Sequence, residues 1–111
     1  SSLLQGAEWT VVELGEAPLV AGSKVTLDFA PDGVVSGHAS CNSFTGAYAL
    51  SGEGLAISRV AGTRMMCDAA LMDQERRFLD ALGGVQGFSI GADGALLLRT
   101  GDGRTIKARR R

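Results

Sequence analysis

The stretch KVTLDFAPDGVVSGHA, from Lys24 to Ala39, indicates a β-hairpin. Its first part places an apolar residue at every second position, at Val25, Leu27 and Phe29. This period of two predicts a half-buried strand over 24–29. The Pro-Asp-Gly sequence at 31–33 supplies a tight turn, so the segment 34–39 is expected to return beside the first strand as a hairpin.

The same pattern recurs along most of the chain. Turn signals separate the apolar runs, at Asp32-Gly33, Ser51-Gly52, Asp93-Gly94 and Asp102-Gly103. Further strands are expected around 9–12, 44–50, 55–57, 88–90, 96–98 and 106–108. About eight short strands joined by short connections favour a mainly β fold, as a curled antiparallel sheet or a small barrel.

One segment, from Ala69 to Leu82, departs from this pattern. It contains no glycine, proline or β-branched residue, and its apolar residues recur near helical spacing, at Leu71, Phe78, Leu79 and Leu82. Asp68 is a suitable N-cap and Gly83 a suitable C-terminal stop. We predict one amphipathic helix packed on the sheet, which makes the fold α+β. Its polar residues are expected on the other sides of the helix, at Asp73, Glu75, Arg76 and Asp80.

The length of 111 residues fits a single domain, with a core over about 9–108 and a basic tail at 109–111. The phases of the strands and the helix predict one contiguous hydrophobic cluster. Its members are Trp9, Val25, Leu27, Phe29, Phe44, Leu55, Ile57, Phe78, Leu79, Leu82, Leu96 and Leu98.

Charge is distributed unevenly along the chain. Five of the 11 basic residues lie in the last eight positions, and the preceding part, with six basic and 12 acidic residues, carries about −6. An acidic body and 5 % aromatic residues argue against nucleic-acid binding. The basic end is interpreted either as a final strand with a solvated tail or as a contact with an anionic membrane surface or polymer.

Targeting segments are not visible in the sequence. No run approaches the roughly 20 apolar residues of a membrane span. The chain starts at Ser1 without an initiator methionine, and we therefore expect a mature or trimmed form in which a signal segment would not be seen.

Two segments, Gly37–Gly46 and Thr63–Cys67, are unusual in composition. The first is crowded with small and polar residues where a strand should continue. It is interpreted either as a tight turn braced by Asn42, a residue type that tolerates a left-handed backbone, or as a ligand pocket. In the second interpretation the polar anchors are Asn42, Ser43 and Thr45.

Catalytic and metal chemistry find little support in these segments. The one histidine, His38, falls on the polar face of its strand, and a cysteine–histidine dyad would need a free Cys41. A metal site from His38, Cys41, Cys67 and Asp68 lacks the usual paired ligand spacing. Met65 and Met66, if in a strand, point to opposite faces, so one is expected in the core. We predict no catalytic residue, metal or cofactor.

The same two segments carry a family resemblance. Cys41-Asn42-Ser43-Phe44-Thr45-Gly46, followed about twenty residues later by Thr63-Arg64-Met65-Met66-Cys67, resembles the META/HslJ domain family. The family also has a strand with tryptophan near its start, similar to Trp9. A helix with a Phe-Leu pair follows its second cysteine, similar to Phe78-Leu79, and closing strands resemble Leu96–Leu98. The resemblance extends from about Trp9 to Ala108.

The resemblance implies a non-catalytic domain of the bacterial cell envelope. The family includes a heat-inducible protein linked to novobiocin resistance, its members are commonly envelope proteins and often lipoproteins, and a related protist protein is tied to virulence. We expect a monomeric module in the periplasm or on an outer-membrane lipoprotein that binds a protein or small ligand. Alternatives are a structural or assembly role, a hydrolase inhibitor and a cysteine-based enzyme. Candidate binding residues are Asn42, Ser43, Phe44, Thr45, Gly46, Thr63, Arg64, Met65 and Met66.

A disulfide between Cys41 and Cys67 is also expected. They are the only two cysteines, and each lies within one of the two family segments. The envelope location that the resemblance implies is an oxidising compartment, where such a bond persists. The alternative is a pair of buried free thiols packed as small hydrophobic side chains.

Overall fold

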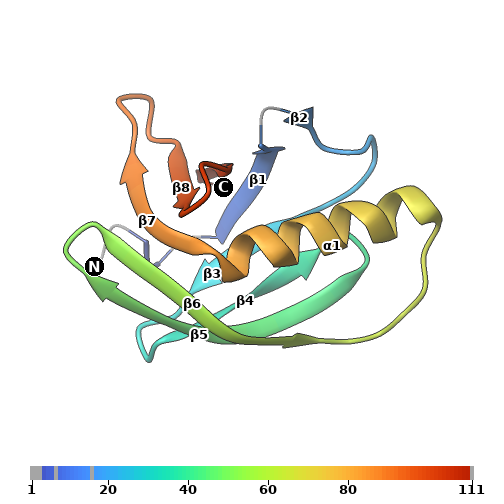
Figure 1. Cartoon of the computed structure of the whole chain (residues 1–111), viewed down its shortest axis with the longest axis horizontal. Coiled ribbons are helices and arrows are strands. Elements are labelled where there is room, and N and C mark those ends of the chain that lie inside the picture. The colour runs from blue at the N-terminus through green and yellow to red at the C-terminus, as the bar shows by residue number, and fades with distance from the viewer. Residues whose placement is uncertain (1–3, 7, 16, 111) are drawn as a thin grey trace.

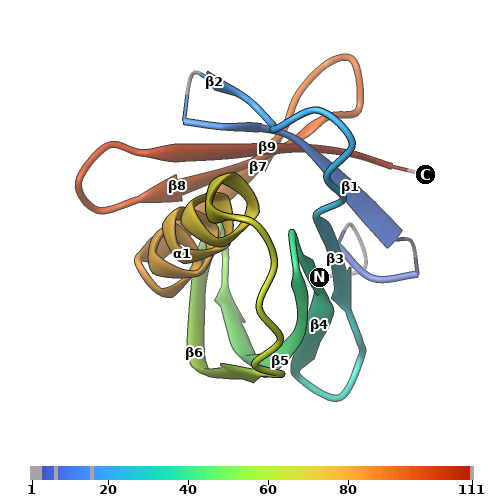
Figure 2. The same cartoon turned by 90° about the vertical axis from the view of Figure 1, so that its right-hand side faces the viewer.

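The computed structural model describes residues 4–6, 8–15 and 17–110. In this part of the chain, eight antiparallel strands form a closed barrel that carries one helix, α1 (Ala69–Gly83), on its side (Figures 1 and 2). The barrel strands are β1 (Glu8–Leu14), β3 (Thr26–Phe29), β4 (Val34–Ala39), β5 (Asn42–Ser51), β6 (Gly54–Gly62), β7 (Val85–Ile90), β8 (Leu96–Thr100) and β9 (Thr105–Arg110). A two-residue strand, β2 (Ala17–Pro18), pairs with β1 and was not predicted.

The barrel closes because β1 pairs with β3 on one side and with β9 on the other. Each remaining strand pairs with its neighbour in sequence. The shortest strand pairing in the barrel is the one between β6 and β7, in which Gly54 lies opposite Gly87. Helix α1 connects these two strands and lies between β6 and the β7–β8 hairpin (Figure 2). Along most of β6, the edge that does not pair with β5 therefore has no strand partner, and the helix lies on that side.

The predicted turns are confirmed. The hairpin predicted over 24–39 forms, with Phe29 opposite Val35. The glycine of each predicted turn pair adopts a positive φ, which side chains disfavour, at Gly33, Gly52, Gly94 and Gly103.

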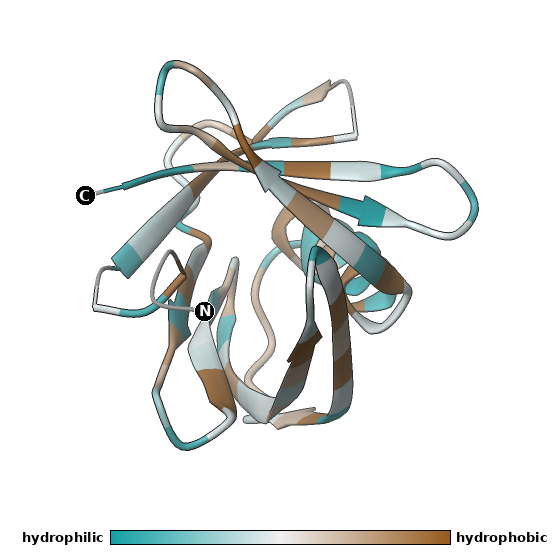
Figure 3. Ribbon diagram, turned by 90° about the vertical axis from the view of Figure 1, so that its left-hand side faces the viewer, coloured by the Kyte–Doolittle hydropathy of each residue, from teal (hydrophilic) through white to brown (hydrophobic). Residues whose placement is uncertain are grey.

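The hydrophobic core fills the barrel and continues under the helix. Eleven of the twelve predicted residues belong to one buried cluster. The exception is Leu79, which is half-buried and packs against the cluster from outside. Phe78 is fully buried, and its ring meets Phe44 of β5 edge-on at 5.7 Å between centroids. Along the strands, hydrophobic residues alternate with hydrophilic ones, as one face lines the core (Figure 3).

Helix α1 agrees with its predicted bounds within one residue. The side chain of Asp68 accepts a hydrogen bond from the Leu71 amide at 3.0 Å, so the predicted N-cap is confirmed. Gly83 is the last helical residue and Gly84 the C-cap, which corrects the predicted stop. Among the described residues, no helix is long and apolar enough to cross a membrane.

The buried face of α1 differs from the prediction. It consists of Gln74, Glu75, Phe78, Ala81 and Leu82. Leu71 is only half-buried, and the expectation that Glu75 lies on an outer face is wrong. The reason is chemical, because the barrel surface beneath the first half of the helix presents hydrogen-bonding groups.

The basic end forms a strand, as the first of its two interpretations predicted. Strand β9 extends to Arg110, so Arg109 and Arg110 are not a tail, and Arg111 lies outside the described residues. Arg109 lies 3.4 Å from Asp93, and Arg110 stacks 5.4 Å above the ring of Trp9.

Arg104, at the start of this basic stretch, forms ion pairs with Asp102 and Asp80. Hydrogen bonds from the Thr100 hydroxyl and from Arg104 lower the pKa of Asp102 to about 2. Much of the basic charge at this end of the chain is thus paired within the domain.

Candidate functional site

The turn between β4 and β5 is held against the helix. Ser40 adopts a positive φ of 79°, so it is the left-handed residue of this turn, and the expectation that Asn42 fills this role is corrected. The Ser40 hydroxyl donates to the Leu71 carbonyl at 3.0 Å and accepts from Gln74 at 3.2 Å. The interpretation of this segment as a braced turn is confirmed, but the brace reaches a distant element.

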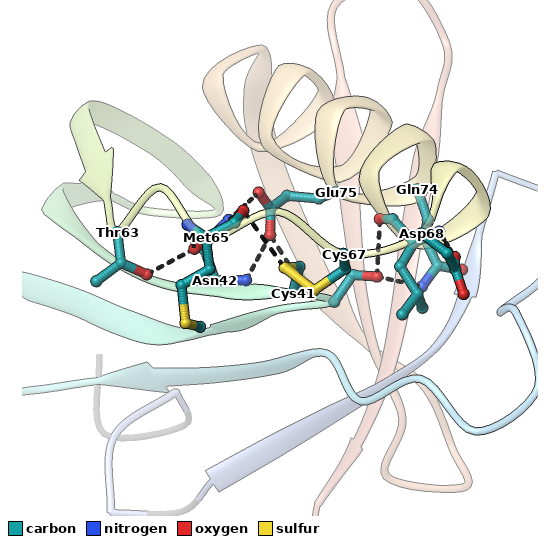
Figure 4. The surroundings of a disulfide bond; sticks show 10 residues. Cys41, Asn42, Thr63, Met65, Cys67, Asp68, Gln74 and Glu75 are labelled. Carbon is teal, nitrogen blue, oxygen red and sulfur yellow. Dashed lines mark hydrogen bonds between the residues drawn. A yellow bond between two sulfur atoms is a disulfide. The ribbon is translucent and has the colours of Figure 1, made fainter.

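The predicted disulfide is present and links this turn to the helix start. Cys41 and Cys67 are bonded, with their Cα atoms 6.1 Å apart (Figure 4). Cys67 directly precedes the N-cap, so the bond joins the β4–β5 turn to the segment that enters α1. The bond also removes Cys41 as a nucleophile and both sulfurs as thiolate ligands.

Asn42, the first residue of β5, clamps the 63–66 segment. Its Oδ1 accepts from the Met65 amide at 2.6 Å and from the Thr63 hydroxyl at 2.8 Å. Its Nδ2 donates to the Met65 carbonyl at 3.1 Å and to Glu75 at 2.8 Å. Both backbone polar groups of Met65 are therefore bound by one buried side chain, whose donors and acceptors are fully used (Figure 4).

Glu75 completes this network from the helix. Its Oε1 accepts hydrogen bonds from the backbone amides of Cys41, at 3.1 Å, and Asn42, at 2.6 Å. Its Oε2 accepts a hydrogen bond from the side-chain amide of Asn42. Only 7 % of Glu75 is exposed. Sequence reasoning missed this residue because of its charge. The available signal was its spacing, four residues after Leu71 and three before Phe78, which places it on the buried stripe.

Gln74 provides a parallel connection to the β2–β3 loop. Its Oε1 accepts from the Val20 amide at 2.7 Å, and its Nε2 donates to Ser23 at 2.9 Å as well as to Ser40. No buried side-chain nitrogen or oxygen lacks a partner among the residues that the structure describes. Such a satisfied network favours one fixed arrangement of the turn, the helix and the 63–66 segment.

Replacing Glu75 with glutamine is expected to lower the free energy of unfolding by about 2 kcal/mol. One carboxylate oxygen becomes an NH₂ group, which faces a buried donor, and an unsatisfied buried donor costs roughly 1–3 kcal/mol. Urea titration measures the loss. Exposed Glu53→Gln is the control, and equal small effects of both changes would contradict the role of Glu75.

Asn42→Ala is expected to destabilise the fold by about 2 kcal/mol, and His38→Ala by less than about 1 kcal/mol. His38 is half-buried on β4, and its side chain makes no hydrogen bond with the described residues, whereas the Asn42 side chain makes four. Parallel thermal melts compare the two variants. A smaller shift for Asn42→Ala than for His38→Ala would refute the clamp.

Two methionines of the clamped segment project into solvent. Met65 is 57 % exposed and Met66 84 % exposed. They lie in an irregular connection and not in a strand, so the expectation that one of them fills the core is wrong. Asn42 fixes the backbone of Met65, and the disulfide fixes Cys67. Met66 is therefore held between two anchored residues.

A groove of about 390 Å³ lies beside these methionines, between the β5–β6 hairpin and the helix. We call it the signature groove because both family segments line it. The residues of those segments that reach it include Asn42, Ser43, Phe44, Thr63, Arg64, Met65 and Met66. Val60, Met72 and Leu79 add apolar surface, so that all three methionines of the chain line this groove.

The remaining candidate residues lie elsewhere. Thr45 lines a shallow depression that shares Ser43 and Phe44 with the signature groove. Gly46 allows the close packing of β5 on β6, because a Cβ there would lie 3.0 Å from the Ser58 carbonyl oxygen. His38 does not line the groove. In the described part of the chain, no group of three or more His, Cys, Asp or Glu residues is placed to hold a metal ion.

One charged side chain at the groove is available to a partner. Glu75 is occupied by the Asn42 network. In the adjoining depression, Arg76 pairs with Asp73 at 2.6 Å and Asp80 pairs with Arg104 at 2.9 Å. Arg64 is exposed and, among the described residues that line the groove, is the charged group without an ion pair or hydrogen bond. The groove thus offers apolar surface beside one available positive charge.

Comparison with solved structures supports the fold. A protein from Burkholderia xenovorans, solved by NMR, is 25 % identical, with a TM-score of 0.79 over 99 % of this chain and 85 % of that chain. Another NMR structure is 26 % identical, with a TM-score of 0.74 over 96 % of this chain and 90 % of that one. A DUF4847 family protein from Bacteroides vulgatus shares the fold at 15 % identity, with a TM-score of 0.71 over 96 % of this chain and 93 % of its own.

Sequence comparison supplies the family. No curated protein matches the chain. The META domain model matches residues 2–111, which include both family segments and the whole described barrel. The resemblance inferred from those segments is therefore confirmed, and the chain belongs to the META domain family.

Proposed function

We propose that this domain is a non-catalytic binding module of the bacterial cell envelope, and that the signature groove is its binding surface. The observation that carries the proposal is the exposure of Met65 and Met66 on an anchored backbone. Exposed apolar side chains are common in loops, but here a buried network and a disulfide hold them in place. The exposed parts of these two side chains gain about 2–4 kcal/mol when a partner buries them, before the cost of association.

Two features favour binding over catalysis. Cys41, the strongest nucleophile in the sequence, is bonded to Cys67. Within the described residues, the polar groups that line the groove are mainly engaged with one another, which leaves Arg64 without an acid or base beside it. A hydrolytic site needs an activated nucleophile and a base within hydrogen-bonding reach of each other.

The disulfide supports the location. Such bonds persist in oxidising compartments, which include the bacterial periplasm and the cell surface. The periplasm, or an outer-membrane lipoprotein, is thus the proposed setting. A contribution to heat-stress or novobiocin tolerance follows from the family resemblance and belongs to the same proposal.

Site-specific photocrosslinking in cells tests this function. A benzophenone amino acid replaces Met66 in one variant and Glu53, in the exposed β5–β6 turn, in the control. We expect one discrete adduct from position 66 and none from position 53. An adduct of fixed stoichiometry throughout growth would identify an assembly role, and the absence of any adduct at 66 under both normal and heat-stressed growth would overturn the proposal.

Complementation connects the groove to stress tolerance. In a strain that lacks the gene, Met66→Asp is expected to restore novobiocin and heat tolerance less well than the wild type, because a charge replaces an exposed apolar contact. Glu53→Lys is the matched surface control and should restore tolerance fully. Full rescue by Met66→Asp at equal protein levels would separate the groove from tolerance.

A further inference from the structure

We infer that the partner of the signature groove is an extended protein segment with alternating apolar side chains and a carboxylate that pairs with Arg64. In this arrangement the segment lies in the groove between β6 and the helix, along the edge of β6 that pairs with no strand. The inference rests on the proposed binding function and specifies the chemistry of its partner.

The shape of the surface favours an extended segment. The groove shares Val60, Met72 and Leu79 with a depression along the helix, and Ser43, Phe44 and Thr63 with another depression beside β5. The three hollows therefore adjoin one another and form one continuous, open surface from the helix to β5. Sites for small apolar ligands such as fatty acids are concave and enclose about 70–90 % of the ligand. An open surface of this kind would leave one side of an acyl chain in water, whereas a partner protein covers its own segment.

The backbone of β6 supplies a second argument. Its register with β7 consists of Gly54 opposite Gly87, while its register with β5 extends to Gly62. The Thr63 amide donates to the Ser43 carbonyl at 3.0 Å, which directs Thr63 toward β5. Successive residues of an antiparallel strand direct their backbone groups to opposite sides. The N–H and C=O of Gly62 are therefore directed away from β5, toward the side where a peptide strand can add.

Gly62 keeps this edge accessible. The residue is exposed, and a Cβ there would lie 2.5 Å from the Ser43 carbonyl oxygen, so the tight β5–β6 pairing requires glycine. The same feature leaves the backbone groups of Gly62 without a side chain to shield them. Unshielded strand edges are the surfaces on which proteins add extended peptides.

The side chains around this edge define the preferred partner. Met65, Met66 and Met72 have flexible thioether side chains, which adapt to apolar side chains of different shapes. Arg64 provides a planar guanidinium suited to a carboxylate. Because the neighbouring Arg76 and Asp80 are already paired, Arg64 determines the sign of the charge that the groove prefers.

Selection from a phage-displayed library of random dodecapeptides tests this chemistry. The folded wild-type domain is expected to enrich peptides with alternating apolar residues and at least one Asp or Glu. For a synthetic peptide from that pool, Arg64→Glu should weaken binding by about tenfold. Lys24→Glu is the matched control because it makes the same charge change at an exposed site outside the groove, and it should bind within about twofold of the wild type.

Backbone methylation of the peptide tests strand addition. N-methyl groups at alternate residues remove the amides that pair with β6, whereas N-methyl groups in the other register face solvent. One register is expected to abolish binding and the other to preserve it, with NMR shift changes concentrated at 60–66.

Three results would overturn the inference. They are no enriched peptide with an acidic residue, equal binding by Arg64→Glu and Lys24→Glu, or equal effects of both methylation registers. A discrete cellular adduct at position 66 alongside any of these results would leave the binding function standing. It would show that the partner is not an extended acidic segment.

Discussion

Phe78→Ala is expected to lower the free energy of unfolding by about 3–5 kcal/mol, the usual cost of truncating a fully buried phenylalanine. Phe78 joins the helix to the barrel through its edge-on contact with Phe44. Its removal leaves a cavity in the core beside the ring of Phe44, which loses its edge-on partner. Urea titration followed by tryptophan fluorescence measures the loss.

The adjacent Leu79 offers a matched control for this prediction. It follows Phe78 on the same helix but is only half-buried, so Leu79→Ala should cost clearly less, about 1–2 kcal/mol. A loss below about 1 kcal/mol for Phe78→Ala would show that the helix does not dock through this side chain.

Removal of the disulfide is the second large effect. The double variant Cys41→Ala/Cys67→Ala is expected to be about 3 kcal/mol less stable than the oxidised wild type, because the bond joins residues 26 positions apart and restricts the unfolded chain. Denaturant titration of both proteins measures the difference. The buried contacts of Asn42 and Glu75 remain in the variant, so the fold should persist.

Mass spectrometry provides the chemical control. Protein purified from the envelope and alkylated under denaturing conditions, without reductant, should carry no alkyl group. Two alkylated cysteines would show that the bond does not form in the cell. Equal stability of the double variant and the oxidised protein would show that the bond contributes little to the fold.

The regular elements could be predicted from sequence because local patterns determine them. The alternation at 24–29 and the Asp32-Gly33 turn produced a hairpin that the structure contains. The capping residue Asp68 and the run without β-branched residues determined where α1 begins. Barrel closure through β1 and β9 could not be predicted, because this pairing joins opposite ends of the chain and has no local signal.

The site was predictable in position but not in its physical organisation. The family segments located the residues, yet the buried role of Glu75 depends on backbone amides 33 and 34 residues away in sequence. The prediction that one of Met65 and Met66 fills the core assumed a tendency of this segment to form a strand. The Asn42 clamp overrides that tendency by occupying both backbone groups of Met65. Long-range hydrogen bonds of this kind leave little trace in sequence periodicity.

The two family segments, together with Glu75 of the helix, thus form a buried brace and an exposed pair of methionines. Asn42, Glu75 and the disulfide form the brace, and Met65 and Met66 are held by it at the groove. This division explains why the segments contain residues as different as a buried asparagine and an exposed methionine pair. It also makes the rigidity of the 63–66 segment the central claim.

Backbone ¹⁵N relaxation of Met65 and Met66 tests that claim most directly. In the wild type, their amide order parameters are expected near 0.85, as in a rigid strand, although their side chains are exposed. In Asn42→Ala, with the disulfide intact, they should fall to about 0.6 or below. Order parameters of about 0.6 or below in the wild type, or no change on removal of Asn42, would contradict the account.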